Sequence, residues 1–428
     1  EISNINLVNI DITSTSSTLP AGGLVASNGC WVKNCTVSGT LSAVTNAGLL
    51  AGVVTSSSNG ITPRISACTV SGEISASGSS AGALVGNNHG YILSCYSSDN
   101  TLVSGSTYSG GLVGDNSGII SQCYSWAEVQ ASGDYAGGFI GKNSGIISSC
   151  YSTGSVTSTN ADNINGFCSE NTGSVVGCFW NIATSGLQDD GAGTGYTGLS
   201  ADQMKDKDIY ENAGWNFGSG NPWLMADELM WPRLSALFNF SGGEGTALSP
   251  NIIYTEIDFL LVSELPDRHY QLDNDFNLTG YTLQTSLFGN LEKDMPFSGV
   301  LDGNGHTISN ITIKRASNGA GLFGYISSTD NASTIAGVKN LILNNVHIET
   351  DGIYNTAGAL AGYINNGFIS NCAVRNGYVF ASMYAGGLAG YAENAQITNC
   401  CFTGAIEAVF CAGGISGGLR YSSIDGCY

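Results

Sequence analysis

The chain has 428 residues, of which 42% are hydrophobic and only 11% are charged, and its 33 acidic against 13 basic residues give a formal net charge of −20. This charge disfavours nucleic acid and anionic membrane surfaces as partners, and the many Tyr, Phe and aliphatic residues exclude a disordered chain. The 60 glycines and the scarcity of charge disfavour a helix-rich fold, and no stretch reaches the roughly 20 apolar residues that a membrane span needs.

Cysteines recur at a nearly constant interval, mostly 27 or 28 residues, in two runs of the chain. These ladder cysteines are Cys35, Cys68, Cys95, Cys123, Cys150 and Cys178, and then Cys372, Cys400 and Cys427. A motif of the form Ala-Gly-Gly-Leu-Val-Gly keeps the same interval, as in Ala136–Gly141 and Ala385–Gly390. We expect its glycines to lie where the backbone turns tightly or neighbouring coils come together, at Gly86, Gly111, Gly114, Gly138, Gly141, Gly387 and Gly390. Such periodicity indicates a stack of identical structural units.

Each repeat consists of short β-branched runs separated by Gly, Asn and Ser, without helical periodicity. We expect three short strands per repeat and a parallel β-helix whose coils lie about 4.8 Å apart. An Ile or Val precedes nearly every ladder cysteine by three residues, as Ile147 precedes Cys150. If both side chains are buried, the chain must bend between them. A cysteine ladder on the outside of the coils is the alternative.

The motifs x-Gly-Gly-Leu-Val-Gly and Gly-x-Ile-x-x-Cys-Tyr resemble the GLUG repeat of large bacterial and archaeal cell-surface proteins. That repeat also occurs in the non-catalytic repeat regions of some immunoglobulin-A-cleaving peptidases. The resemblance covers nearly the whole chain. It implies an all-β fold, a right-handed parallel β-helix (β-solenoid) in two tandem arrays with small mixed caps, and it transfers no catalytic residue.

The resemblance also implies a division of the chain: a first GLUG β-solenoid at residues 1–180, a closing cap with a short helix at 181–245, an opening segment at 250–310 and a second GLUG β-solenoid at 311–428. Ser200 and Gln203 form a potential capping box. We expect helices only at about 200–210 and 255–264. Aromatic residues of the closing cap are expected to cover the last open coil.

Both ends of the sequence are predicted to be open. The stretch Ile2–Ile10 matches Val338–Val346, yet nothing before it corresponds to an opening segment, and the chain stops at Tyr428 without a closing one. An uncovered coil presents unpaired N–H and C=O groups that can pair with another strand. We therefore expect either a fragment of a longer array or copies that add head to tail into a fibre, sheath or surface layer.

No constellation of residues predicts catalysis. A polysaccharide lyase or hydrolase needs converging carboxylates, usually with a balancing cation. The coils between 65 and 160 instead offer one lysine and the scattered carboxylates Glu73, Asp99, Asp115, Glu128 and Asp134. The four histidines lack metal-ligand spacing, and the turn Asp302–Gly305 is more typical of backbone geometry than of a cation site. We predict no catalytic, cofactor-binding or metal-binding residue, and not an enzyme.

The ladder cysteines are predicted to be buried free thiols, because side chains in register on parallel strands point alongside one another. Disulfides between coils are the alternative. The aromatic residues that follow them are predicted to form a structural stack, with a carbohydrate-binding platform as the alternative. They are Tyr96, Tyr124, Tyr151, Phe179, Phe402 (displaced by one) and Tyr428. The predicted function is a non-catalytic extracellular structural protein of the cell surface, a repeat stalk or adhesive component. Its expected partners are other copies of itself and, as a further candidate, surface glycans; the alternative is a carbohydrate-binding module or a polysaccharide-degrading β-helix enzyme.

Overall fold

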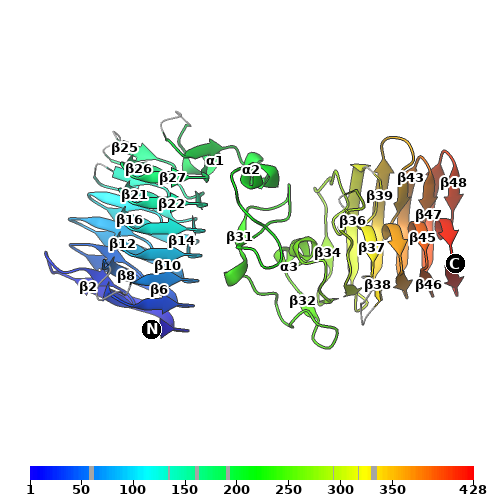
Figure 1. The fold of residues 1–428 in the computed structure, drawn as a ribbon, viewed down its shortest axis with the longest axis horizontal. Coiled ribbons are helices and arrows are strands. Elements are labelled where there is room, and N and C mark those ends of the chain that lie inside the picture. The colour runs from blue at the N-terminus through cyan, green and yellow to red at the C-terminus, as the bar shows by residue number, and fades with distance from the viewer. Residues whose placement is uncertain are drawn as a thin grey trace. The chain divides into compact units, whose positions relative to one another are not determined.

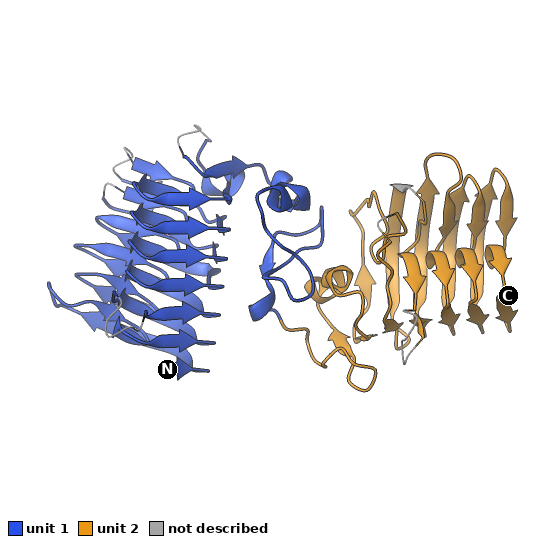
Figure 2. Ribbon diagram, viewed as in Figure 1, with its two compact units in different colours: residues 1–238 blue, residues 239–428 orange. Residues whose placement is uncertain are grey.

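Parallel strands stack coil upon coil in two stretches of the chain in the computed structural model (Figure 1). The structure describes residues 1–56, 62–133, 135–159, 163–188, 193–292, 294–316, 318–328 and 335–428. It comprises two compact units, Glu1–Phe238 and Asn239–Tyr428 (Figure 2). Among the named strands of the described residues, only β30 (Trp223–Leu224) and β31 (Arg233–Leu234) pair antiparallel. The prediction of an all-β parallel solenoid is confirmed.

The coils of the first unit build four sheets, and two coils contribute two strands each to one of them, so the prediction of three strands per coil is wrong. The difference arises within the glycine motif. In the coil from 135 to 152 it forms two strands, β20 (Tyr135–Gly137) and β21 (Ile140–Asn143), with a bend at Gly138–Phe139 between them. The bend turns Phe139 and Ile140 both into the core, where each is fully buried.

The four sheets of the first unit are named sheets 1 to 4. Sheet 1 contains β1 (Ile2–Ser3), β5 (Trp31–Lys33), β9 (Arg64–Ser66), β13 (Tyr91–Leu93), β17 (Ile119–Ser121), β22 (Ile146–Ser148) and β27 (Ser174–Val176). Sheet 2 contains β2 (Asn6–Ser14), β6 (Thr36–Ala43), β10 (Thr69–Ala76), β14 (Tyr96–Gly105), β18 (Tyr124–Ser125), β19 (Glu128–Ala131), β23 (Tyr151–Ser152), β24 (Val156–Ser158), β28 (Cys178–Asn181) and β29 (Tyr196–Leu199). Sheet 3 contains β3 (Ala21–Gly22), β7 (Ala47–Gly48), β11 (Ser80–Gly82), β15 (Tyr108–Gly110), β20 and β25 (Asn163–Asn165). Sheet 4 contains β4 (Val25–Asn28), β8 (Ala51–Val54), β12 (Val85–Asn88), β16 (Val113–Asn116), β21 and β26 (Cys168–Asn171).

The closing segment of the first unit contains more helix than predicted. The expected helical region holds η1 (Gln203–Lys205) and α2 (Lys207–Asn212), and the predicted capping box is confirmed, because the Ser200 N–H donates to Gln203 Oε1 at 3.0 Å and the Gln203 N–H to Ser200 Oγ at 3.2 Å. Two further short helices lie outside the predicted ranges, α1 (Ile182–Ser185) and η2 (Ser235–Leu237). A single turn such as α1 is too short to show periodicity, and its ends are fixed by local caps.

The second unit opens with β32 (Asn251–Ile253), α3 (Glu256–Leu260) and η3 (Leu261–Glu264), and these helices lie in the predicted range. Sheet 5 contains β32, β33 (Tyr270–Leu272), β35 (Val300–Asp302), β38 (Ala336–Lys339), β42 (Gly367–Ser370), β46 (Gln396–Thr398) and β50 (Ser423–Asp425). Sheet 6 contains β34 (Phe276–Asn277), β36 (Thr307–Ala316), β39 (Ile342–Thr350), β43 (Ala373–Ala381) and β47 (Cys401–Ala408). Sheet 7 contains β40 (Thr356–Gly358), β44 (Tyr384–Gly386) and β48 (Cys411–Gly413), and sheet 8 contains β37 (Phe323–Ser327), β41 (Ala361–Asn365), β45 (Ala389–Glu393) and β49 (Ser416–Arg420).

Candidate functional site

The ladder cysteines lie inside the coils, directly after a left-handed bend. The residue before each of the nine cysteines has a φ between 50° and 62°, as in Gln122 (53°) before Cys123 and Ser149 (51°) before Cys150. The bend lets the Ile or Val of sheet 1 and the cysteine both face the core, as Ile147 and Cys150 do with no exposed surface. The corner inferred from the sequence therefore has a backbone cause.

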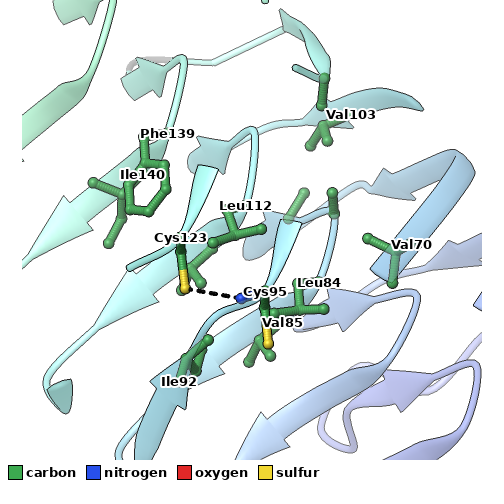
Figure 3. Packing of buried hydrophobic residues seen from close by; sticks show 14 of the residues in the cluster. Val70, Leu84, Val85, Ile92, Cys95, Val103, Leu112, Cys123, Phe139 and Ile140 are labelled. Atoms are coloured by element: carbon green, nitrogen blue, oxygen red, sulfur yellow. Dashed lines mark hydrogen bonds between the residues drawn. The ribbon is translucent and has the colours of Figure 1, made fainter. Parts of the chain in front are cut away.

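Each ladder thiol also satisfies backbone groups at this bend. The Cys123 thiol donates to the Ser121 carbonyl at 3.1 Å and its sulfur accepts the N–H of Cys95, one coil earlier, at 3.4 Å (Figure 3). The same pair of contacts recurs at Cys68, Cys95 and Cys400. A bend in the ladder would otherwise leave buried backbone groups short of partners. Cysteine is thus suited to this position by its weak donor, weak acceptor and apolar character together.

All thirteen cysteines are free. Burial in the apolar core raises the pKa of the Cys95 and Cys150 thiols. The nucleophilic form of cysteine is the thiolate, so a raised pKa favours the protonated form of these two thiols. The ladder cysteines are buried except Cys427, which is half-buried in the outermost described coil.

The motif glycines lie where backbone segments approach too closely to admit a side chain. A Cβ at Gly138 would lie 2.2 Å from the Gly166 carbonyl oxygen, and one at Gly111 would lie 2.1 Å from the Gly138 carbonyl oxygen. The corresponding distances from Gly86, Gly114, Gly141, Gly387 and Gly390 to backbone atoms are 2.6, 2.7, 2.8, 2.2 and 2.6 Å. Each is shorter than any normal Cβ contact, so the motif is a packing requirement of the fold.

A buried ladder of asparagines was missed by the sequence analysis. Asn88 Nδ2 donates to Asn116 Oδ1 at 2.7 Å, and Asn116 Nδ2 donates to Asn143 Oδ1 at 2.8 Å on the next coil. Each side chain also accepts the N–H of the glycine two residues later, at 3.1 Å for Gly118. The signal was present in the sequence, because Asn-x-Gly recurs at the same interval as the cysteines, at 88–90, 116–118, 143–145 and 171–173.

The aromatic row that follows the cysteines is a covered stack. The ring centroids of Tyr96 and Tyr124 are 4.6 Å apart, and those of Tyr124 and Tyr151 are 5.1 Å apart. Trp215 and Trp223 of the closing segment pack against this row, with centroids 6.4 and 6.1 Å from the Tyr151 ring. Tyr124 and Tyr151 are 2% and 0% exposed, so this part of the row offers no platform for a sugar.

The closing-segment aromatics therefore cover the flank of the coils, which corrects the expectation that they cover the last open coil. At the last coil, β29 instead pairs in parallel with β28 and extends sheet 2 by one strand. Covering the flank is favoured because the stacked tyrosines present a broad apolar surface.

The scattered carboxylates stay scattered, with one exception. Asp115, Lys142 and Glu170 lie in register on adjacent strands of sheet 4, and Lys142 Nζ lies 3.3 Å from both Glu170 Oε1 and Tyr108 Oη. Burial raises the pKa of Asp115. This row places one cation between two carboxylates in register, and Lys142 forms an ion pair with Glu170. Glu73, Asp99 and Glu128 are not part of it, and Asp134 lies outside the described residues.

The acidic residues Asp11, Glu73 and Asp302 lie in a shallow groove or a hydrogen-bonded turn. A shallow groove of about 170 Å³ crosses sheet 2 and holds Asp11 and Glu73, with Thr40 between them in register. Asp302 accepts hydrogen bonds from Asn304 N and Asn340 Nδ2, both at 2.9 Å, and lies 3.1 Å from Lys339 Nζ, so its carboxylate is engaged by the turn. Within the described parts of the chain, no three His, Cys, Asp or Glu residues group as a metal site, and no helix is long and apolar enough to cross a membrane.

The fold and its internal ladders define a β-solenoid repeat protein. Residues 132–157 and 381–407 match the family model described as the GLUG motif. Over 138 residues, 30% of this chain, the sequence is 33% identical to Halomucin of Haloquadratum walsbyi, and the match spans 1% of that protein's length. The solved structure of a candidate immunoglobulin A1 protease from Bacteroides ovatus aligns with 54% of this chain and 75% of its own, at 19% identity and a TM-score of 0.39. At these values the likeness has no bearing on function.

Proposed function

We propose that the chain is a non-catalytic structural repeat protein of the cell surface. One observation carries the proposal. Cysteine, asparagine and glycine each keep their own structural role from one coil to the next. Asn88, Asn116 and Asn143 each bond the next coil and cap their own glycine. Such repetition extends an axis by about 4.8 Å per coil, whereas catalysis needs a singular constellation. The partial match to a protein named Halomucin supports a surface setting.

Two measurements test this proposal. Antibodies against the chain should label intact cells of the source organism, and signal that appears only after cell lysis would refute a surface location. The purified chain should not depolymerise acidic polysaccharides. Turnover that is lost in Asp115→Asn but kept in Asp99→Asn would overturn the non-catalytic role and place a lyase or hydrolase at the Asp115–Lys142 row.

Assembly of copies through coil edges is the finer hypothesis. The low charge of the chain eases close packing of subunits, and unpaired strand edges favour pairing. Mass spectrometry of source material gives the natural chain length and decides whether the outer coils of this sequence are free edges. If they are, electron microscopy should show axial stacks that vanish when the first coil is deleted.

A further inference from the structure

The outer face of sheet 1 carries an exposed row of apolar and cationic side chains. Trp31, Arg64, Tyr91, Ile119 and Ile146 occupy equivalent positions on five successive strands and lie in register. Trp31, Tyr91 and Ile146 are 56%, 42% and 47% exposed, and Arg64 is exposed. Lys33 lies on the same face as Trp31, two residues further along β5, and is also exposed.

The charge of this face is opposite to that of the chain. The seven strands of sheet 1 contain no Asp or Glu, although the chain has 33 acidic residues. Residues 1–180 contain three basic residues, Lys33, Arg64 and Lys142, and two of these lie on this face. Among the described residues, neither Lys33 nor Arg64 has an ion-pair partner and neither lies over an aromatic ring, whereas Lys142 has both kinds of contact. The two side chains are therefore available to an anion.

We infer that this face binds a linear acidic polysaccharide in which uronic acids alternate with neutral sugars. Trp31 and Tyr91 are two coils apart, about 9.6 Å, which is about the length of one disaccharide in an extended β-linked chain. Their exposed rings can bury the apolar faces of two neutral sugars. Arg64 lies between them in register, so its guanidinium meets the carboxylate of the intervening uronic acid and can bind it bidentately.

The alternation of ring, cation and ring distinguishes this occupant from other polymers. A single-stranded nucleic acid would also stack on exposed aromatics, but it carries a charge on every unit, whereas this row places one cation between two rings. A neutral glycan would leave Arg64 and Lys33 without partners. The inference goes beyond the structural role proposed above, because a stalk needs no such face.

The experiment titrates the full chain with a hyaluronan decasaccharide in a calorimeter. Binding is expected, and Trp31→Ala and Arg64→Gln should each weaken it about tenfold or more. Two matched controls, Tyr254→Ala and Arg375→Gln, remove an exposed aromatic and an exposed guanidinium of the second unit and should change the affinity less than twofold. Raised salt should weaken binding of the wild-type chain more than that of Arg64→Gln.

Hydroxyl-radical footprinting of the wild-type chain keeps the test independent of how the variants fold. Hyaluronan should protect Trp31 and Tyr91 from oxidation and leave Tyr254 unprotected. Equal protection of all three, undetectable binding at millimolar ligand, affinity unchanged in both variants, or tighter binding of a chito-oligosaccharide or an oligothymidylate would each overturn the inference. Self-association lost in Trp31→Ala would also overturn it, because a second copy would then be the occupant. None of these failures affects the cell-labelling test of the surface role.

Discussion

Replacement of Gly138 by valine should destabilise the first unit severely, whereas the same replacement at Ser148 should not. A Cβ at Gly138 would lie 2.2 Å from the Gly166 carbonyl oxygen, about 1.2 Å short of an ordinary 3.4 Å contact. The two coils must separate at this point to admit it. The hydrogen bonds that hold them there run from Gly138 N to Asn165 O at 3.1 Å and from Phe139 N to Phe167 O at 2.9 Å.

The magnitude follows from these two bonds. Leaving their buried groups unpaired costs about 1–3 kcal/mol each, and the valine methyl groups add an overpacking cost of about 1–3 kcal/mol. Replacing glycine also lowers the conformational entropy of the unfolded chain, and this effect offsets about 1 kcal/mol of the destabilisation. We therefore expect Gly138→Val to lower the free energy of unfolding by roughly 2–8 kcal/mol. Ser148→Val loses one half-buried bond to Ser121 Oγ at 2.9 Å and places a β-branched residue in a strand, so its effect should stay within about 1 kcal/mol.

Tryptophan fluorescence isolates the relevant unit, because all six tryptophans lie before residue 239. Guanidinium denaturation followed at this signal should show a much lower midpoint for Gly138→Val and a nearly unchanged one for Ser148→Val. Equal midpoints for the two variants would refute the reasoning that coil contacts, rather than composition, require glycine at this position.

Three further outcomes are expected. In a thiol-labelling assay of the native chain, exposed Cys411 should react rapidly and buried Cys123 only on unfolding; equal rates would contradict the buried ladder. Asn116→Ala should cost about 2–4 kcal/mol in the fluorescence assay, because it breaks bonds to two neighbouring asparagines and uncaps a glycine; a loss below 1 kcal/mol would contradict a structural ladder. Hydrogen bonds from Asn340 and Asn304 and the nearby Lys339 ammonium hold the pKa of Asp302 below its usual value against the effect of burial. The ionised Asp302 carboxylate therefore stabilises the second unit above the unfolded pKa of about 3.9, and this stabilisation is lost as the pH falls through the folded pKa. In Asp302→Asn, the melting temperature measured by circular dichroism should therefore depend less on pH between about pH 4 and 2 than in the wild-type chain.

The sequence predicted the fold where one residue has the same role in every coil. The cysteine interval indicated the stack, and the Ile-x-x-Cys spacing predicted a corner, which the left-handed residues at Gln122 and Ser149 provide. Such features are visible in sequence because each repeats at a fixed interval along the chain.

What the sequence analysis did not predict depends on how the chain bends within a coil. The Ala136–Gly141 motif has the composition of one strand, and only the bend at Gly138 divides it in two. The aromatic row was predicted, but its covering was not. Trp215 and Trp223 reach Tyr151 from more than sixty residues away, and no local pattern encodes that contact.

Side chains inside the coils are constrained by contacts with the next coil, whereas side chains on the outer faces are constrained less. A specific binding function is therefore expected on the outer faces. Inside, the bond from Asn88 to Asn116 favours the same residue on the next coil, so the asparagine ladder repeats with little change. Outside, side chains in register are free to differ, and on sheet 1 they change from Trp31 to Arg64 to Tyr91 over three coils. A solenoid therefore offers a partner a row of side chains at a fixed spacing of about 4.8 Å. Recognition by such a row favours a ligand that is itself periodic, and a linear polysaccharide has that property.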